Sequence, residues 1–276
     1  MCRMAAYAGP EAPLSVLLSD PPWALTEQAW RARMPGSAGA PPRGSPGPSE
    51  STANAVNVDG TGAVWWPDGG RERPPLRYVT ELPPWADPNL LGLAGRLQGA
   101  MQLALVRSAT PGLPYGAWSV APFVHGNLAV AHNGRVGGFR GIPGRRLLER
   151  LPDDLHAGLS ALTDSAVLAA LVAAELRDRP ERGLAGALGA TVAAVEKVCA
   201  DAGEAATLTL LAADGRRIAG VRAALGRASN TLFTRCGRGV ALAASEPLDD
   251  DPGWVEVPDL HLVELDADGT STRPLY

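Results

Sequence analysis

Two long helical stretches, placed between two groups of strand-like segments, constrain the fold of this chain most. Thr163 and Asp164 are suited to begin a helix whose apolar side chains recur at helical spacing, namely Val167, Leu168, Leu171, Val172 and Leu176. Residues 183–203 repeat this pattern, with Leu188, Val192, Val195 and Val198 on one face. Two consecutive amphipathic helices predict one helical layer, because each must bury its apolar face against something else.

Strand-like segments precede and follow these helices. Apolar runs predict strands over residues 4–7, 63–66, 77–80, 101–106 and 128–131 before them, and over 207–212, 217–223, 231–234, 240–245 and 260–265 after them. The first strand is expected to end at Gly9-Pro10, the strand 128–131 to present residues 132–134 at its end, and shorter helices to cover 14–18 and 88–98. Asp214-Gly215 and Asp268-Gly269 are typical hairpin turns. This order of elements predicts layered α+β packing around one core.

The overall composition is that of an ordinary globular protein. The chain has 276 residues, of which 46% are hydrophobic and 20% charged. Its net charge of −4 and the absence of a basic run argue against a nucleic-acid partner. No signal-peptide pattern and no membrane-length apolar run is present, so we expect a cytoplasmic protein without a membrane partner. The composition carries no signal for an oligomeric state.

Three cysteines, Cys2, Cys199 and Cys236, are too few and too widely spaced for a disulfide scaffold or a zinc site. We therefore expect no metal and no cofactor. Cys199, among apolar neighbours in the second helix, is expected in the core, and Cys236 is expected to be structural.

Residues 34–55 differ in composition from the rest of the chain, because they are dense in Pro, Gly and Ser. This composition predicts a flexible loop, with a lid over a nearby site as the alternative. Apart from that loop, we expect residues 2–276 to form a single domain.

Cys2 holds an unusual position for a thiol. Removal of Met1 would leave a chain that begins with cysteine, so that one residue carries both a nucleophilic sulfur and a free α-amine. An α-amine has an ordinary pKa of about 7.7–8.0, and a useful fraction is therefore unprotonated and able to act as a base near neutral pH. This is the arrangement of N-terminal nucleophiles.

Several separated motifs agree with Cys2. They are Met1-Cys2-Arg3, Asp20-Pro21-Pro22, Asn57 to Gly62, Arg107 to Thr110, His132-Asn133-Gly134, Thr163-Asp164-Ser165 and Ala244 to Leu248. In this order the chain resembles the class II glutamine amidotransferases, which are N-terminal nucleophile hydrolases, and more narrowly the stand-alone amidohydrolases of ergothioneine biosynthesis. The resemblance spans nearly the whole chain outside the 34–55 loop. It implies a four-layer αββα sandwich that cleaves the γ-glutamyl amide of γ-glutamyl-hercynylcysteine sulfoxide, a small-molecule substrate, and releases glutamate.

The resemblance also implies roles for six residues. Cys2 would be the nucleophile, and the Asn133 side-chain amide with the Gly134 backbone N–H would form the oxyanion hole. Arg107 would bind the α-carboxylate of the glutamyl group with help from the Thr110 hydroxyl, and Asp164 would bind its α-ammonium. His132 is expected to shape the turn that holds Asn133 and not to act as a base.

Each role has a simpler alternative. Arg107 could form only a surface salt bridge, Asp164 only a helix cap, and Asn133-Gly134 only a hairpin turn. Two other functions also stay open, namely a glutaminase subunit that supplies ammonia to a separate synthetase, and a catalytically silent γ-glutamyl-binding relative. The chain departs from the family pattern at Met4, Trp23, Val58 and Thr61, which could alter recognition of the amine half of the substrate.

Overall fold

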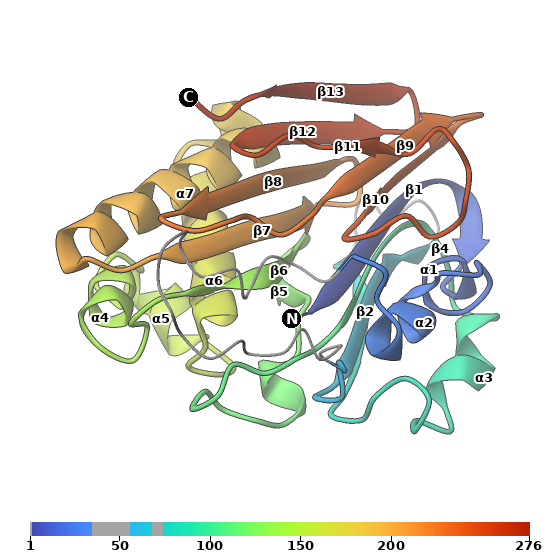
Figure 1. The fold of residues 1–276 in the computed structure, drawn as a ribbon, viewed down its shortest axis with the longest axis horizontal. Helices are drawn as coiled ribbons and strands as arrows, with labels where there is room; N and C mark the ends of the chain where they lie inside the picture. Colours follow the sequence, from blue (N-terminus) through green and yellow to red (C-terminus); the bar gives the residue numbers. More distant parts are fainter. Residues whose placement is uncertain (1, 35–55, 68–73) are drawn as a thin grey trace, which may run out of the picture.

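Two antiparallel sheets, packed face to face, form the centre of the molecule in the computed structural model, which describes residues 2–34, 56–67 and 74–276 (Figure 1). Within these residues the first sheet has the order β11-β9-β10-β1-β4-β2-β3 and the second has the order β13-β12-β8-β7-β6-β5. The first sheet contains β1 (Arg3–Pro13), β2 (Thr61–Trp66), β3 (Leu76–Thr80), β4 (Gln98–Val106), β9 (Phe233–Gly237), β10 (Val240–Ala244) and β11 (Val255–Glu256). The second contains β5 (Phe123–His125), β6 (Leu128–Val136), β7 (Ala206–Ala213), β8 (Ile218–Leu225), β12 (His261–Asp266) and β13 (Gly269–Pro274).

Helices cover the outer face of each sheet, and Figure 1 shows them on opposite sides of the pair. The long helices α6 (Asp164–Asp178) and α7 (Gly183–Ala202) cover the second sheet, and the shorter α4 (Ile142–Leu148) and α5 (Asp153–Ala157) extend this layer. The first sheet is covered by α1 (Ser15–Leu18), α2 (Leu25–Trp30) and α3 (Leu90–Ala94). Single 3₁₀ turns lie at Ala117–Ser119 and Pro180–Arg182. The predicted αββα order of layers is confirmed.

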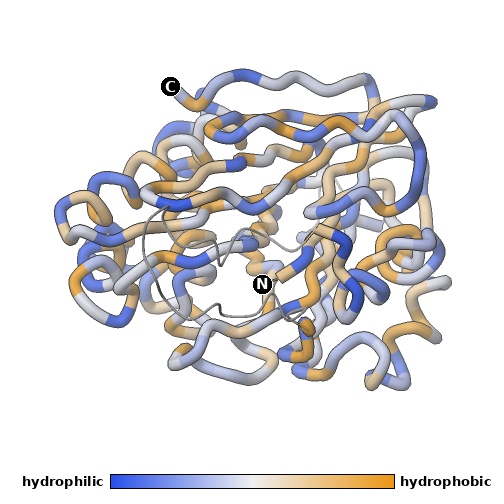
Figure 2. Tube along the Cα trace, in the orientation of Figure 1, coloured by the Kyte–Doolittle hydropathy of each residue, from blue (hydrophilic) through white to orange (hydrophobic). Residues whose placement is uncertain are grey.

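The central strands of the first sheet are buried on both faces because their side chains alternate between two cores. In β1, Met4 and Ala6 pack toward the second sheet, whereas Ala5 and Tyr7 pack toward the helices α1 and α2. Trp66 and Trp65 of β2 divide in the same way, as expected for core residues of a strand. Figure 2 shows hydrophobic stretches along the central strands and hydrophilic stretches mainly at the turns.

Helix α6 begins as predicted, because the Thr163 side chain accepts a hydrogen bond from Ala166 N. Helix α7 ends at Gly203, which has a left-handed backbone with φ of 67°. Residues 180–202 are long and apolar enough to cross a membrane, but half of that stretch is buried and α7 packs on β7 and β8. It therefore has the character of a core helix.

Several element boundaries differ from the prediction, among them the end of β1 and the extent of α3. Strand β1 continues beyond Gly9-Pro10 to Pro13, because the pairing with β4 resumes at Ala12 after a shift of register. The helix expected over 88–98 is reduced to α3, because Gln98 already pairs with Pro13. The short elements α2, α4, α5, β5 and β11 carry too little periodic pattern to be predicted. The predicted loop over 34–55 lies outside the described residues except for Met34.

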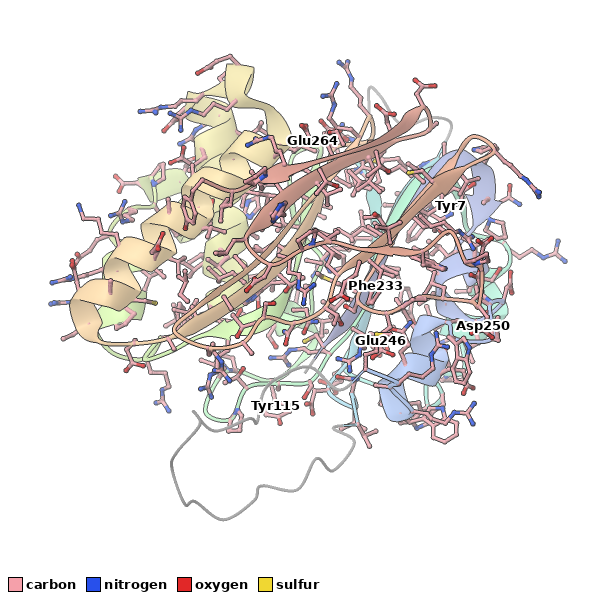
Figure 3. All side chains as sticks on the ribbon, turned by 45° about the horizontal axis from the view of Figure 1, so that its top comes forward. Tyr7, Tyr115, Phe233, Glu246, Asp250 and Glu264 are labelled. Carbon is pink, nitrogen blue, oxygen red and sulfur yellow. The ribbon has the colours of Figure 1, made fainter. Side chains whose placement is uncertain are left out.

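A buried ion pair fixes the start of β1. Arg3 Nε lies 2.9 Å from Glu246 Oε1, and both side chains are at most 6% exposed. The second carboxylate oxygen, Oε2, accepts a hydrogen bond of 2.8 Å from Arg33 N. Figure 3 shows Glu246 between the first strand and the helices that cover it. Glu246 therefore ties the N-terminal strand to the chain that follows α2.

We predict that Glu246→Gln lowers the free energy of unfolding by about 3 kcal/mol, because it removes the carboxylate charge that pairs with a buried guanidinium. Urea-induced unfolding measures this loss. The matched control is Asp250→Asn, which removes an exposed carboxylate from its ion pair with Arg33 and should change stability little. Equal losses in the two variants would contradict the prediction.

Candidate active site

The start of β1 and the end of β4 lie side by side, because these strands pair antiparallel with Arg3 opposite Val106. Cys2, just before β1, therefore meets the residues just after β4. The Cys2 Sγ accepts a hydrogen bond from Ser108 N at 3.4 Å and lies 3.6 Å from Ser108 O. Cys2 is half-buried and unpaired with another cysteine. Antiparallel pairing thus places the thiol beside the Arg107–Thr110 motif.

Hydrogen bonds hold the segment after β4 against the loop before β2. Arg107 N donates to Gly60 O at 2.8 Å, Asp59 N donates to Arg107 O at 3.0 Å, and Ala109 N donates to Asp59 Oδ2 at 2.7 Å. Gly60 has a φ of 129°, and a Cβ there would lie 2.7 Å from Thr80 O. The motifs that contain Asp59 and Arg107 therefore form one rigid unit next to Cys2.

The Arg107 side chain is a buried cation with unused hydrogen-bonding capacity. It is 6% exposed, and its Nη2 donates to Pro114 O at 2.9 Å. Its Nη1 is buried and has no hydrogen-bond partner among the described residues. The guanidinium carbon lies 5.7 Å from the centre of the Tyr115 ring, which Figure 3 shows at the periphery. Because a buried cation is costly without an anion, this arrangement suits an anionic ligand. The alternative that Arg107 forms only a surface salt bridge is therefore wrong, because its side chain is buried.

The second sheet contributes Asn133 and Gly134, which lie within β6 and not in a turn at its end. This corrects the prediction that the strand ends at Ala131. The strand continues because β6 stays paired with β7, with Asn133 opposite Thr209 and Gly134 opposite Leu208. A hairpin turn at Asn133-Gly134 is therefore wrong, and so is a turn shaped by His132.

The Gly134 backbone N–H points away from β7. Gly137 N donates to Ala205 O on the β7 side at 2.8 Å, whereas Val136 N donates to Asp164 Oδ2 at 3.0 Å. Because N–H groups of successive strand residues alternate between the two sides, the N–H of Gly134 lies on the side of that of Val136. The pairing of β5 with β6 ends at Val130, so no described strand covers this edge at Gly134. The edge of β6 therefore presents a backbone donor.

Gly134 cannot carry a side chain in this position. An added Cβ would lie 1.9 Å from Thr207 O and 2.5 Å from His132 Nε2. Glycine is therefore required here by close packing against β7 and by the neighbouring imidazole.

The Asn133 side chain points across the sandwich toward the first sheet. Its Nδ2 lies 3.4 Å from Ser245 Oγ, and Ser245 Oγ accepts a hydrogen bond of 3.1 Å from Met4 N. Its Oδ1 accepts from Asn230 Nδ2 at 3.3 Å. Asn133 is buried, as are Ser245 and Asn230. The amide of Asn133 is thus linked to β1 two residues after Cys2.

Asp164 lies at the same edge of β6, at the first position of α6. Its Oδ2 accepts from Val136 N and its Oδ1 accepts from Ser165 N at 2.8 Å. The carboxylate is 3% exposed. The helix cap itself is Thr163, so Asp164 is more than a cap because it also ties α6 to β6. Oδ2 retains a second lone pair for a ligand, whereas Ser165 Oγ lies 3.5 Å from Oδ1.

His132 joins β6 to the start of α6 as a neutral ring. Burial lowers its pKa below the ordinary value, although the Asp164 charge and the Thr207 carbonyl favour the protonated form. Because Thr207 O can only accept, the ring donates from Nε2 to it at 3.1 Å and accepts from Ser165 Oγ at Nδ1, at 3.0 Å. Both nitrogens are occupied, so His132 is a structural residue.

Hydrogen bonds thus join Cys2 to the segment after Arg107 and join Asn133 to β1 through Ser245, while Gly134 and Asp164 lie at one edge of β6. Thr110, the sixth predicted residue, is half-buried in the turn after Arg107, where its carbonyl accepts from Leu113 N at 3.1 Å. Ser108 and Ser245 lie inside two of the sequence motifs but had no predicted role of their own. Asn230 lies outside every motif and carried no signal. Within the described ranges, no group of three His, Cys, Asp or Glu side chains is arranged to hold a metal ion.

The other two cysteines, and the four residues that depart from the family pattern, lie in different environments. Cys199 is buried, as predicted, whereas Cys236 is exposed on β9 and its sulfur contacts Thr270 of β13, so its structural role stays a prediction. Met4 and Thr61 are fully buried, whereas Val58 is exposed. The Trp23 ring lies 4.2 Å from the Arg33 guanidinium.

Comparison with known proteins shows what the chain as a whole is similar to. No protein-family model matches the chain. The gamma-glutamyl-hercynylcysteine sulfoxide hydrolase of Mycolicibacterium smegmatis is 35% identical over 265 residues, which cover 96% of each chain. The protein of the same name from Mycobacterium tuberculosis is 34% identical over 100% of this chain and 97% of that relative. A glutamine aminotransferase class-II domain protein from Silicibacter pomeroyi has the same fold, with a TM-score of 0.68, 21% identity and 99% coverage of both chains.

We predict that His132 makes the protein less stable in mild acid. Below the ordinary histidine pKa of about 6.5, the unfolded chain takes up a proton that the buried ring resists, so stability falls as pH falls toward the lower folded pKa. Unfolding in urea between about pH 7 and pH 5 should show a smaller acid loss in His132→Gln than in the wild type.

His156→Gln is the control for this effect, because His156 is exposed, and it should keep the wild-type dependence. His125, whose pKa burial also lowers, contributes equally in all three proteins. The same acid loss in His132→Gln and the wild type would show that the His132 ring is not the group responsible.

Proposed function

Because this chain belongs to the family of γ-glutamyl-hercynylcysteine sulfoxide hydrolases, we propose that it hydrolyses the γ-glutamyl amide bond of that sulfoxide and releases glutamate. The observation that carries this proposal is the buried Arg107 Nη1, which has no partner among the described residues and belongs to the segment that contacts Cys2. A glutamyl group offers the carboxylate that this nitrogen needs and the carbonyl that the thiol would attack.

In the proposed reaction, Cys2 acts on the γ-glutamyl carbonyl. Once Met1 is removed, the α-amine of Cys2 takes the thiol proton, and Sγ forms a bond to the carbonyl carbon. The oxygen becomes an oxyanion, stabilised by the Gly134 N–H and the Asn133 Nδ2. The amine then returns the proton to the leaving nitrogen as the C–N bond breaks. Water hydrolyses the resulting thioester, which frees glutamate and restores the thiol.

The glutamyl group would be held by charges of opposite sign. The Arg107 guanidinium would bind the α-carboxylate through Nη1, with the Thr110 hydroxyl as a further donor. Asp164 would bind the α-ammonium with the lone pairs that its two backbone contacts leave. Its position at the open edge of β6, beside Gly134, supports this role.

We propose that residues 2–276 act as one glutamine amidotransferase domain on this small-molecule substrate in the cytoplasm. A reducing compartment is consistent with the free cysteines, of which Cys236 is exposed.

The proposal is tested by intact mass together with a glutamate-release assay on one purified sample. We expect a chain without Met1 that cleaves γ-glutamyl-hercynylcysteine sulfoxide much faster than glutamine. Faster cleavage of glutamine would indicate a glutaminase subunit instead. Binding of the sulfoxide without turnover would indicate a silent γ-glutamyl-binding relative.

We predict that Cys2→Ala abolishes glutamate release, because it removes the only thiol that contacts the Arg107 segment in the described residues. Cys236→Ala should retain wild-type kcat and KM, because its exposed sulfur contacts only Thr270 among the bonds described. The glutamate-release assay compares both. Activity that survives Cys2→Ala and disappears in Cys236→Ala would refute the assignment of the nucleophile.

We predict that Arg107→Gln raises KM for the γ-glutamyl substrate by about tenfold or more, because a charge-assisted hydrogen bond contributes about 1.5–3 kcal/mol. The thermal midpoint should not fall, since the substitution removes a buried charge that has no ion pair among the described residues. Steady-state kinetics and thermal unfolding measure the two effects. An unchanged KM would contradict the clamp, and a large loss of stability would indicate a structural ion pair.

A further inference from the structure

The Asn133 side chain contributes to an oxyanion hole only if its nitrogen, and not its oxygen, faces β1, the strand that follows Cys2. An asparagine amide is nearly symmetric in shape, so packing alone does not choose between the two orientations. Ser245, the neighbour on the side of β1, does not determine the orientation either. Ser245 Oγ can accept from an amide nitrogen or donate to an amide oxygen, because a hydroxyl does both.

Asn230 determines the orientation of the Asn133 amide. Its Nδ2 donates to the backbone oxygen of Asn133 at 3.0 Å and to Asn133 Oδ1 at 3.3 Å. The backbone oxygen can only accept, so it fixes which end of the Asn230 amide faces Asn133. The amino group of Asn230 in turn needs an oxygen opposite it, which fixes Asn133 Oδ1 on that side and turns Asn133 Nδ2 toward Ser245.

Asn230 is itself held firmly. It is 2% exposed and lies in the connection between β8 and β9. The next residue, Thr231, donates from Oγ1 to Ser245 O at 2.8 Å, and Leu232 O accepts from Val257 N at 2.8 Å. The connection is therefore attached to the same segment that receives the Asn133 amide, and the distance between the two partners of Asn133 is fixed.

We propose that Asn230 is a positioning residue, which orients the Asn133 amide so that its nitrogen faces the oxyanion. This inference rests on the proposed amide hydrolysis, because the orientation matters only where negative charge develops. Asn230 does not touch the reacting atoms. Its effect on the reaction passes through Asn133 alone.

The test is a double-mutant cycle of Asn230→Ala and Asn133→Ala, with kcat and KM measured by glutamate release. Loss of an oxyanion donor lowers kcat about 10²–10³-fold, which sets the upper limit for Asn230→Ala. We expect Asn230→Ala to lower kcat by about tenfold or more at an unchanged KM, and the double variant to be no slower than Asn133→Ala. Losses that multiply in the double variant, or a kcat within about twofold of wild type in Asn230→Ala, would overturn the proposal.

Asn127→Ala is the matched control, because Asn127 also bridges segments through both ends of its amide but lies before the opposite end of β6. Its Oδ1 accepts from Trp66 Nε1 at 2.8 Å and its Nδ2 contacts Asp214 O. It should lower the thermal midpoint and leave kcat unchanged. An equal fall of kcat in Asn127→Ala would mean that Asn230→Ala acts through general stability, and would overturn the proposal.

A spectroscopic measurement separates this inference from the proposed function. The side-chain ¹⁵N–¹H signals of Asn133, assigned by their absence in Asn133→Ala, should shift in Asn230→Ala and stay in place in Asn127→Ala. If the wild type cleaves no γ-glutamyl amide, the proposed function fails, and this shift still decides whether Asn230 orients Asn133. Unshifted signals in Asn230→Ala would overturn the inference even in an active enzyme.

Discussion

The antiparallel pairing of β1 with β4 is the constraint on which the rest of the site depends. It places residue 2 next to the residues that follow Val106, so that the thiol and the Arg107 guanidinium belong to one rigid unit. Two further attachments keep this unit in register, namely the buried Arg3–Glu246 ion pair and the hydrogen bonds between Met4 and Ser245. A chain terminus is normally the least ordered part of a domain, and here it is held on both sides by neighbouring strands.

The second sheet completes the site because β5 is short. Its pairing with β6 ends at Val130, and β6 continues to Val136, so the backbone donors of one edge remain available on a strand that contacts β1. Exposed strand edges are usually covered or blunted in proteins. Here Asp164 occupies part of that edge and the N–H of Gly134 remains directed outward. The site is therefore formed by an incomplete sheet edge on one side and a strand terminus on the other.

The sequence predicted the elements whose pattern repeats over many residues. Helices α6 and α7 and the strands β7, β8 and β12 followed from periodicity and capping, because their apolar faces are long. Boundaries set by pairing with distant strands were predicted poorly, as at Pro13 and at Gln98, since no local pattern records the partner. In the site, Cys2 and Arg107 follow motifs, whereas Asn230 acts only through contacts with a residue almost one hundred positions away. Such a residue is identified from its contacts in the three-dimensional structure and not from a sequence motif.

The position of β1 has a consequence for the order in which the enzyme is made. The first strand pairs with β10, in which Ala244 lies opposite Ala5, so β1 gains this neighbour only after all the residues between them have been synthesised. Contacts between such distant segments form late in folding, because closing a long loop has a high entropic cost. A nascent chain that ends before β10 therefore lacks part of the structure that holds β1 in place. Cys2 acquires its full surroundings only when β10 has been synthesised and has paired with β1.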